Sequence, residues 1–195
     1  MKHWLIMIGC AVLVVSGASA QQKKAVPPPP KPKDEGPSLE VTMKFIQDKV
    51  DGVGPVNYVE YVHDNTAGND WTNKLRGQVS NIVAVASACR IAYHWKEERN
   101  GTVASDVQGG FSLKSVGDVV IVSAEQYQKE IDTAGGHPEY SYRIDPPVFW
   151  LRVRRTDIKG SNDLPFFDEQ MANRVAKAMV HAVELCGGGA KPEPF

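Results

Sequence analysis

Two cysteines have the positions of a structural disulfide. Cys89 alternates with the apolar Ile91 and Tyr93, as on the buried face of a strand, and Cys186 ends an apolar helical stretch. An N-terminal export signal would remove the third cysteine, Cys10, and leave this pair in an oxidising compartment. The pattern therefore predicts a Cys89–Cys186 disulfide that closes a loop of almost a hundred residues. Two separate buried thiols are the alternative.

A tryptophan and two arginines share one face of a predicted strand. Between residues 148 and 155, apolar side chains alternate with Trp150, Arg152 and Arg154. If the apolar set enters the core, the other set presents an indole and two guanidiniums on the outer face. Tryptophan and arginine are enriched at binding hot spots, so these three are the predicted binding residues. The alternative is a tryptophan packed under a loop or under the first helix.

The loop from His63 to Trp71 is rich in side-chain oxygens from Asp, Asn and Thr residues. Such oxygens can hold calcium, but the loop lacks the alternating acids and final glutamate of an EF-hand, and the same residue types are typical of turns. The histidines have no zinc-ligand spacing. The sequence therefore predicts no metal site and no cofactor.

Catalysis has little support in the motifs. The predicted mature chain has no nucleophile elbow, phosphate loop, Cys-x-x-Cys or His-Glu-x-x-His. If the protein is a small hydrolase, scattered polar residues must form its site, and His63, Asp64 and His94 are the nearest candidates.

Residues 1–20 have the pattern of a cleavable signal peptide. Lys2 precedes an apolar run from Trp4 to Val15, and Ala18-Ser19-Ala20 supplies the small residues that signal peptidase needs. The run is too short to span a bilayer, and no later stretch approaches a membrane span. We expect an exported protein that is periplasmic or secreted.

Residues 21–37 are rich in Lys and Pro and include four consecutive prolines, so we expect an extended, disordered spacer. Residues 38–187 form the predicted single domain, and 188–195 a flexible tail. The formal net charge of the whole chain is −1. That balance argues against nucleic-acid binding.

The domain is predicted to be α+β, with a helix at each end. Ser38 caps a helix with an apolar stripe, and Asp168 caps a final helix that reaches Cys186. Asn100-Gly101 is a type I′ hairpin signal. Between the helices, alternation predicts seven strands near residues 56–62, 77–85, 88–96, 102–113, 118–123, 139–144 and 148–155.

Seven strands followed by one helix resembles the pleckstrin-homology-like fold, a strongly bent antiparallel barrel capped by its C-terminal helix. The competing architecture is an open antiparallel sheet with both helices on one face. Segments 110–116 and 176–187 look like parts of uncharacterised exported bacterial proteins, a family that implies no activity. We do not expect phosphoinositide binding, because charges in the first hairpin loop nearly cancel.

These features favour an exported, non-catalytic binding domain of the bacterial cell envelope, whose partner is a protein or an envelope component. A small secreted hydrolase and a passive envelope structural protein are the alternatives.

Overall fold

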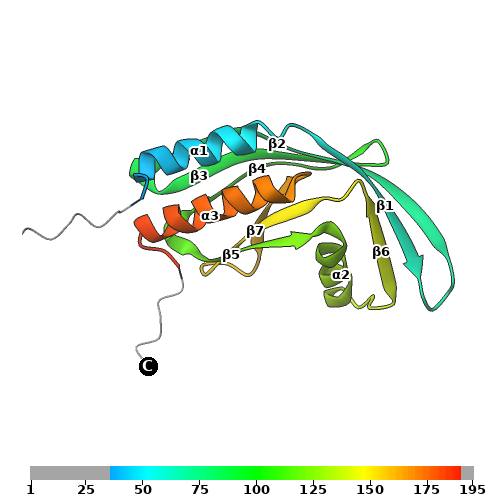
Figure 1. Ribbon diagram of the computed structural model, residues 1–195. Helices are drawn as coiled ribbons and strands as arrows, with labels where there is room; N and C mark the ends of the chain where they lie inside the picture. Colours follow the sequence, from blue (N-terminus) through cyan, green and yellow to red (C-terminus); the bar gives the residue numbers. More distant parts are fainter. Residues whose placement is uncertain (1–35, 190–195) are drawn as a thin grey trace, which may run out of the picture. The chain divides into compact units, whose positions relative to one another are not determined.

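The computed structural model describes residues 36–189, which form three α-helices and eight β-strands (Figure 1). The helices are α1 (Leu39–Asp51), α2 (Ala124–Ala134) and α3 (Glu169–Leu185). The strands are β1 (Val56–Asp64), β2 (Asp70–Val85), β3 (Arg90–Arg99), β4 (Thr102–Ser112), β5 (Val116–Ser123), β6 (Tyr140–Asp145), β7 (Phe149–Arg155) and β8 (Ser161–Phe166). The predicted signal peptide, nearly all of the predicted spacer and most of the predicted tail lie outside the described residues.

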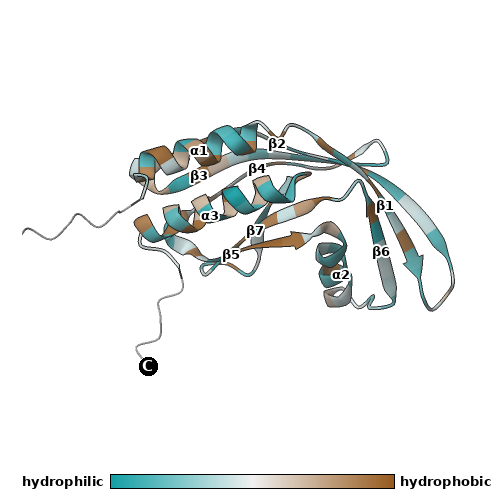
Figure 2. Cartoon of the chain, in the orientation of Figure 1, coloured by the Kyte–Doolittle hydropathy of each residue, from teal (hydrophilic) through white to brown (hydrophobic). Residues whose placement is uncertain are grey.

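Both predicted helices begin at the expected residues. The Ser38 hydroxyl accepts the Val41 N–H at the start of α1, and the Asp168 carboxylate accepts the N–H groups of Gln170 and Met171 at the start of α3. Each bond satisfies a backbone donor that has no partner within its helix. Figure 2 shows hydrophobic and hydrophilic residues side by side on α1 and α3, as expected of helices with one buried face.

The strands form two antiparallel sheets. The larger has the order β4-β3-β2-β1-β6 and the smaller the order β5-β7-β8. The prediction of seven strands was therefore wrong by one, and the described strands do not close into a barrel. The α+β class and the antiparallel pairing are confirmed.

The larger sheet packs its buried face against α1 and the smaller sheet, and α3 lies against α1 and the smaller sheet. One core cluster joins residues of the larger sheet, the two helices and the smaller sheet, including Ile91, Ile46, Met179 and Leu151. A bulge near Asn81, which has a φ of 52°, adds one residue to β2. As a result, Ile82 after the bulge is buried on the same side of the strand as Val79 before it. This arrangement is closer to the open-sheet alternative than to a barrel. We call this buried side of the larger sheet its inner face.

The helix α2 was not predicted, although its start has a local signal. The Ser123 hydroxyl accepts the Gln126 N–H, and the sequence Ser-x-x-Gln is a capping box. The helix packs beside β6, β5 and β7. Its first residue, Ala124, joins a second apolar cluster that includes Val56, Ile144 and Trp150. Thus α2 connects the β6 edge of the larger sheet to the smaller sheet.

The two cysteines of the predicted disulfide lie at bonding distance. The Sγ atoms of Cys89 and Cys186 are 2.10 Å apart, and 97 residues separate them in the chain. Cys89 does not lie on a strand face as expected. It has a φ of 48° in the turn before β3, whereas Cys186 caps the end of α3. The pair therefore connects the β2–β3 turn to the last turn of α3.

Candidate functional site

The three predicted binding residues of β7 occupy the face that alternation assigns to them, but two of them are buried. Trp150 is 6% exposed and Arg152 is 8% exposed. Only Arg154 reaches solvent, where it forms an ion pair with Asp118 of β5 at 3.5 Å. The expectation of an exposed indole beside two exposed guanidiniums is therefore wrong. The alternative of a packed tryptophan is correct, but Trp150 packs against α2 and not under a loop or under the first helix.

The helix α2 provides this cover through Tyr127 and Glu130. The Tyr127 ring stacks on Trp150 with the ring centroids 5.1 Å apart, and the Arg152 guanidinium lies 4.6 Å from the Tyr127 centroid. Arg152 donates to Glu130 at 2.5 Å and to Asp163 of β8 at 3.3 Å. The hydrogen bond from Arg152 holds the pKa of Glu130 below its ordinary value. Arg152 is thus a structural link among α2, β7 and β8.

A cavity of about 580 Å³ lies between α2 and the inner face of the larger sheet. Residues from β1, β3 and β4 line its sheet side, and residues from α2, β7 and β8 line the opposite side. This volume is within the range of small-ligand sites. Of the predicted binding residues, Trp150 alone belongs to the lining.

Aromatic rings form much of the cavity wall. Five such residues belong to the lining: Tyr58, Tyr93, Trp95, Tyr127 and Trp150. The Trp95 and Trp150 rings meet edge to face, with centroids 5.9 Å apart. Such packing holds large flat surfaces in fixed positions.

Glycines on neighbouring strands make room for two of these rings. A Cβ atom at Gly77 would lie 2.6 Å from the Trp95 ring, and a Cβ atom at Gly109 would lie 2.6 Å from the Tyr93 ring. Both distances are shorter than two non-bonded carbon atoms can approach each other. The two rings therefore occupy space that a larger residue at Gly77 or Gly109 would fill, and both rings belong to the cavity lining.

A buried carboxylate contributes to the cavity wall. Glu60 is 3% exposed, and its Oε1 accepts a hydrogen bond from the Asn73 amide at 2.8 Å. Burial raises the pKa of Glu60, with smaller contributions in the same direction from Asp132 and Glu97. The Arg99 guanidinium, 4.0 Å from Oε1, opposes this rise only in part. A carboxylate in such surroundings gains from a bound cation or hydrogen-bond donor.

A polar group of β8 faces the same cavity. The Asn162 Nδ2 donates to the Tyr93 hydroxyl at 2.9 Å. The Asn162 Oδ1 is buried and has no hydrogen-bond partner among the described residues. Buried polar atoms are nearly always paired in native proteins, so this acceptor suits a ligand that brings a donor.

The hydrolase candidates are not brought together. His63 pairs with Asp70 at one end of β2, whereas His94 lies opposite Ser80, ten residues along the same strand. At roughly 3.3 Å per residue this is a separation of about 30 Å along β2. Asp64 caps its own turn by accepting the backbone N–H groups of Thr66 and Ala67.

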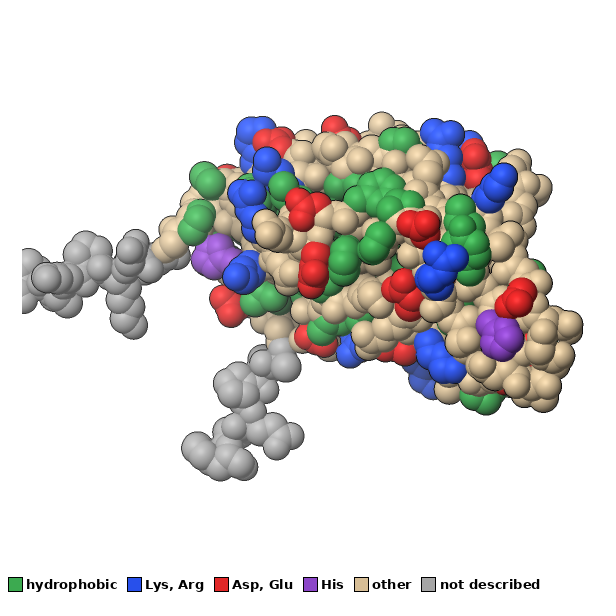
Figure 3. Space-filling view, turned by 45° about the vertical axis from the view of Figure 1, so that its right-hand side comes forward, with side chains coloured by type: hydrophobic (Ala, Val, Ile, Leu, Met, Phe, Trp, Pro, Cys, Tyr) green, Lys and Arg blue, Asp and Glu red, His purple; other side chains and the backbone are tan. Residues whose placement is uncertain are grey.

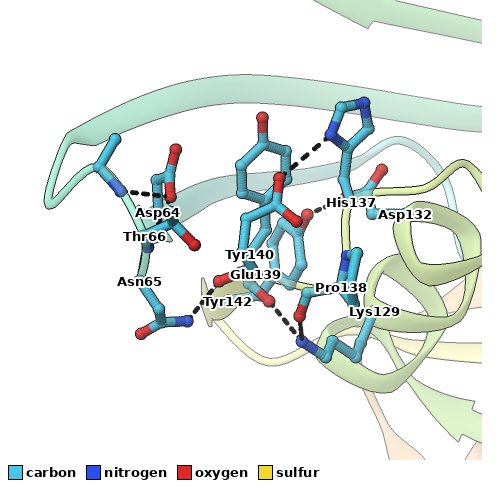
Figure 4. Close-up of polar contacts among 11 residues, drawn as sticks. Asp64, Asn65, Thr66, Lys129, Asp132, His137, Pro138, Glu139, Tyr140 and Tyr142 are labelled. Atoms are coloured by element: carbon cyan, nitrogen blue, oxygen red, sulfur yellow. Dashed lines mark hydrogen bonds and ion pairs between the residues drawn. The ribbon is translucent and has the colours of Figure 1, made fainter.

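The oxygen-rich loop from His63 to Trp71 is hydrogen-bonded to the loop between α2 and β6. Figure 4 shows Asn65 reaching the Glu139 carbonyl, and Lys129 of α2 donating to the carbonyls of Pro138 and Tyr140. No group of three or more metal-binding side chains occurs within residues 36–189. The Asp64 carboxylate accepts backbone N–H groups within the turn, and the Asp70 carboxylate pairs with the His63 ring.

The face of the molecule drawn in Figure 3 has no large patch of purely basic or purely acidic side chains. Basic and acidic side chains alternate there around a central group of apolar ones. None of the described helices is long and apolar enough to cross a bilayer.

Comparisons with known proteins add no relative. No family model matches the chain, and no curated protein or solved structure matches it significantly. The candidate site therefore rests on its own geometry.

Proposed function

We propose that this chain is an exported, non-catalytic binding domain of the bacterial cell envelope that holds a small ligand in the cavity beneath α2. The observation that carries the proposal is the cavity of about 580 Å³, with five aromatic rings and a buried carboxylate in its wall. A few polar groups set among aromatic side chains are typical of sites that bind and orient a ligand.

Export is supported by two independent features. The first twenty residues have the pattern of a cleavable signal peptide. Cys89 and Cys186 lie at disulfide distance, and such pairs are common in exported proteins. A ligand that the protein meets outside the cytoplasm is therefore an envelope component or a molecule that enters from the surroundings.

The decisive experiment identifies what the protein carries. The protein is isolated from the exported fraction of producing cells without denaturation, and native mass spectrometry compares its mass with that of the bare chain. We expect a bound molecule, released on unfolding.

Two valines of β4 give a matched pair of variants for this experiment. Val107 lines the cavity and is 50% exposed, whereas Val103 is 52% exposed and does not line it. The larger side chain of Val107→Trp should obstruct the cavity and abolish the bound mass, and Val103→Trp should leave it unchanged. Equal occupancy in both variants would contradict the proposed site.

A further inference from the structure

The charged groups of the cavity wall are mostly acceptors. Glu60, Glu97 and Asp163 line it, against the single guanidinium of Arg99. Three carboxylates and one guanidinium give the lining a formal charge of −2. Behind the lining, Arg152 pairs with both Glu130 and Asp163, and these three side chains together carry a formal charge of −1. Glu60, Glu97 and Arg99 carry the other −1.

The hydrogen-bonding pattern has the same bias. The Asn162 Oδ1 is buried without a donor, and the Glu60 carboxylate has one side-chain donor on Oε1, the Asn73 amide. A ligand that supplies N–H donors would satisfy these acceptors. A carboxylate or phosphate ligand would find one guanidinium, already 4.0 Å from Glu60.

The aromatic faces favour a cation as well. Tyr93 and Trp95 belong to the cavity lining, and the face of an aromatic ring carries partial negative charge. A positive charge over such a face is attracted by the ring quadrupole, and the attraction grows when water is excluded. Tyr127 of the lining already makes one such contact, with the Arg152 guanidinium behind it.

We propose that the cavity binds an organic cation: a protonated amine whose N–H groups meet Glu60 and Asn162 and whose apolar body lies against Tyr93 and Trp95. This inference rests on the proposed function, because it assigns a chemical class to the ligand of the same cavity.

The test uses three probes of one shape and different charge. The purified protein is titrated with 2-phenylethylamine, 2-phenylethanol and 3-phenylpropionate at neutral pH, and binding is followed by tryptophan fluorescence and by NMR. We expect the amine to bind about tenfold more tightly than the alcohol. The anion should bind more weakly than either.

Charge variants of the two β4 valines supply the control. Val107→Lys and Val103→Lys change the net charge equally, but only the first places an ammonium at the cavity. We expect Val107→Lys to weaken amine binding roughly three- to tenfold more than Val103→Lys, as a charge a few ångströms from the ligand would do. Circular dichroism confirms that both variants are folded.

The outcomes separate this inference from the proposed function. If the alcohol or the anion binds as tightly as the amine, and Val107→Trp abolishes that binding, the cavity is a ligand site but the inference is wrong. If none of the three probes binds, the inference is wrong, and an unoccupied protein from the exported fraction would then overturn the proposed function too.

Discussion

Arg152 and Arg154 offer the sharpest comparison in the molecule, because they share a strand and a face but differ in burial. We predict that Arg152→Met destabilises the protein strongly and that Arg154→Met does not. Methionine keeps the apolar stem of arginine and removes only the charged, hydrogen-bonding end. The difference between the variants therefore reports the environment of the guanidinium.

The expected magnitudes follow from the contacts. The Arg152 side chain is 9% exposed and joins Asp163, 15% exposed, to Glu130, 41% exposed. Removing one partner of a buried pair costs about 3 to 5 kcal/mol, and the partial exposure of Glu130 places this case near the lower end. Arg154 and Asp118 are both 51% exposed, so their pair contributes about 0 to 1 kcal/mol.

Urea unfolding of the wild type and both variants measures these changes in free energy. We expect a loss of about 3 kcal/mol for Arg152→Met and less than about 1 kcal/mol for Arg154→Met, with little effect of 0.5 M salt on the first. Losses that agree within about 0.5 kcal/mol would refute the assignment of Arg152 as the buried link between α2 and β8.

The remaining predictions concern the glycine beneath a ring, the buried carboxylate and the cysteine pair. Gly109→Val should lower the free energy of unfolding by about 1 to 3 kcal/mol, because the new side chain would clash with the Tyr93 ring. Gln108→Val, at the exposed neighbouring residue, should lower it by less than about 0.5 kcal/mol. Equal urea midpoints for the two variants would contradict the placement of the Tyr93 ring over Gly109. The folded-state pKa of Glu60 is raised above 4.5, so its contribution to stability is lost as pH rises through that pKa. Glu60→Gln should therefore raise Tm at pH 8 and leave it unchanged at pH 4, and a lower Tm at pH 8 would show that the ionised form is stabilising. Reduction of the Cys89–Cys186 pair should lower stability by up to about 4 to 5 kcal/mol, given its 97-residue separation, and unfolding curves that coincide with and without reductant would contradict the bond.

Local signals in the sequence predicted the parts of the fold that depend on neighbouring residues. Ser38 and Asp168 cap their helices as expected. Asn100 and Gly101 form the β3–β4 turn with φ angles of 53° and 81°. These features need only a few residues and no knowledge of the rest of the chain.

Other elements were missed because their signals were weak or were interpreted without context. The strand β8 contains Pro165, which normally argues against a strand. It is tolerated because β8 lies at the edge of its sheet. The capping box at Ser123 was present in the sequence, but it follows a strand directly and starts a helix of modest hydrophobicity.

The candidate site depends on register and packing, which alternation alone does not give. The alternating pattern assigned Trp150 and Arg152 to the correct face of β7, but not the helix that covers them. In the cavity wall, Tyr93 of β3 is paired with Gly109 of β4, and its ring lies where a Cβ atom at that position would clash. Only the strand register brings these two residues together. The available signal in the sequence was the Gly109-Gly110 pair within a strand pattern, because a glycine in a strand often marks the close approach of another group.

An NMR experiment on the indole N–H groups tests the central claim most directly. Three tryptophans lie in the described residues: Trp95 and Trp150 line the cavity, whereas Trp71 lies outside it. Titration with the best-bound of the three phenyl probes should shift the signals of Trp95 and Trp150 and leave that of Trp71 in place. A shift of Trp71 alone, with the other two unmoved, would contradict a ligand site beneath α2.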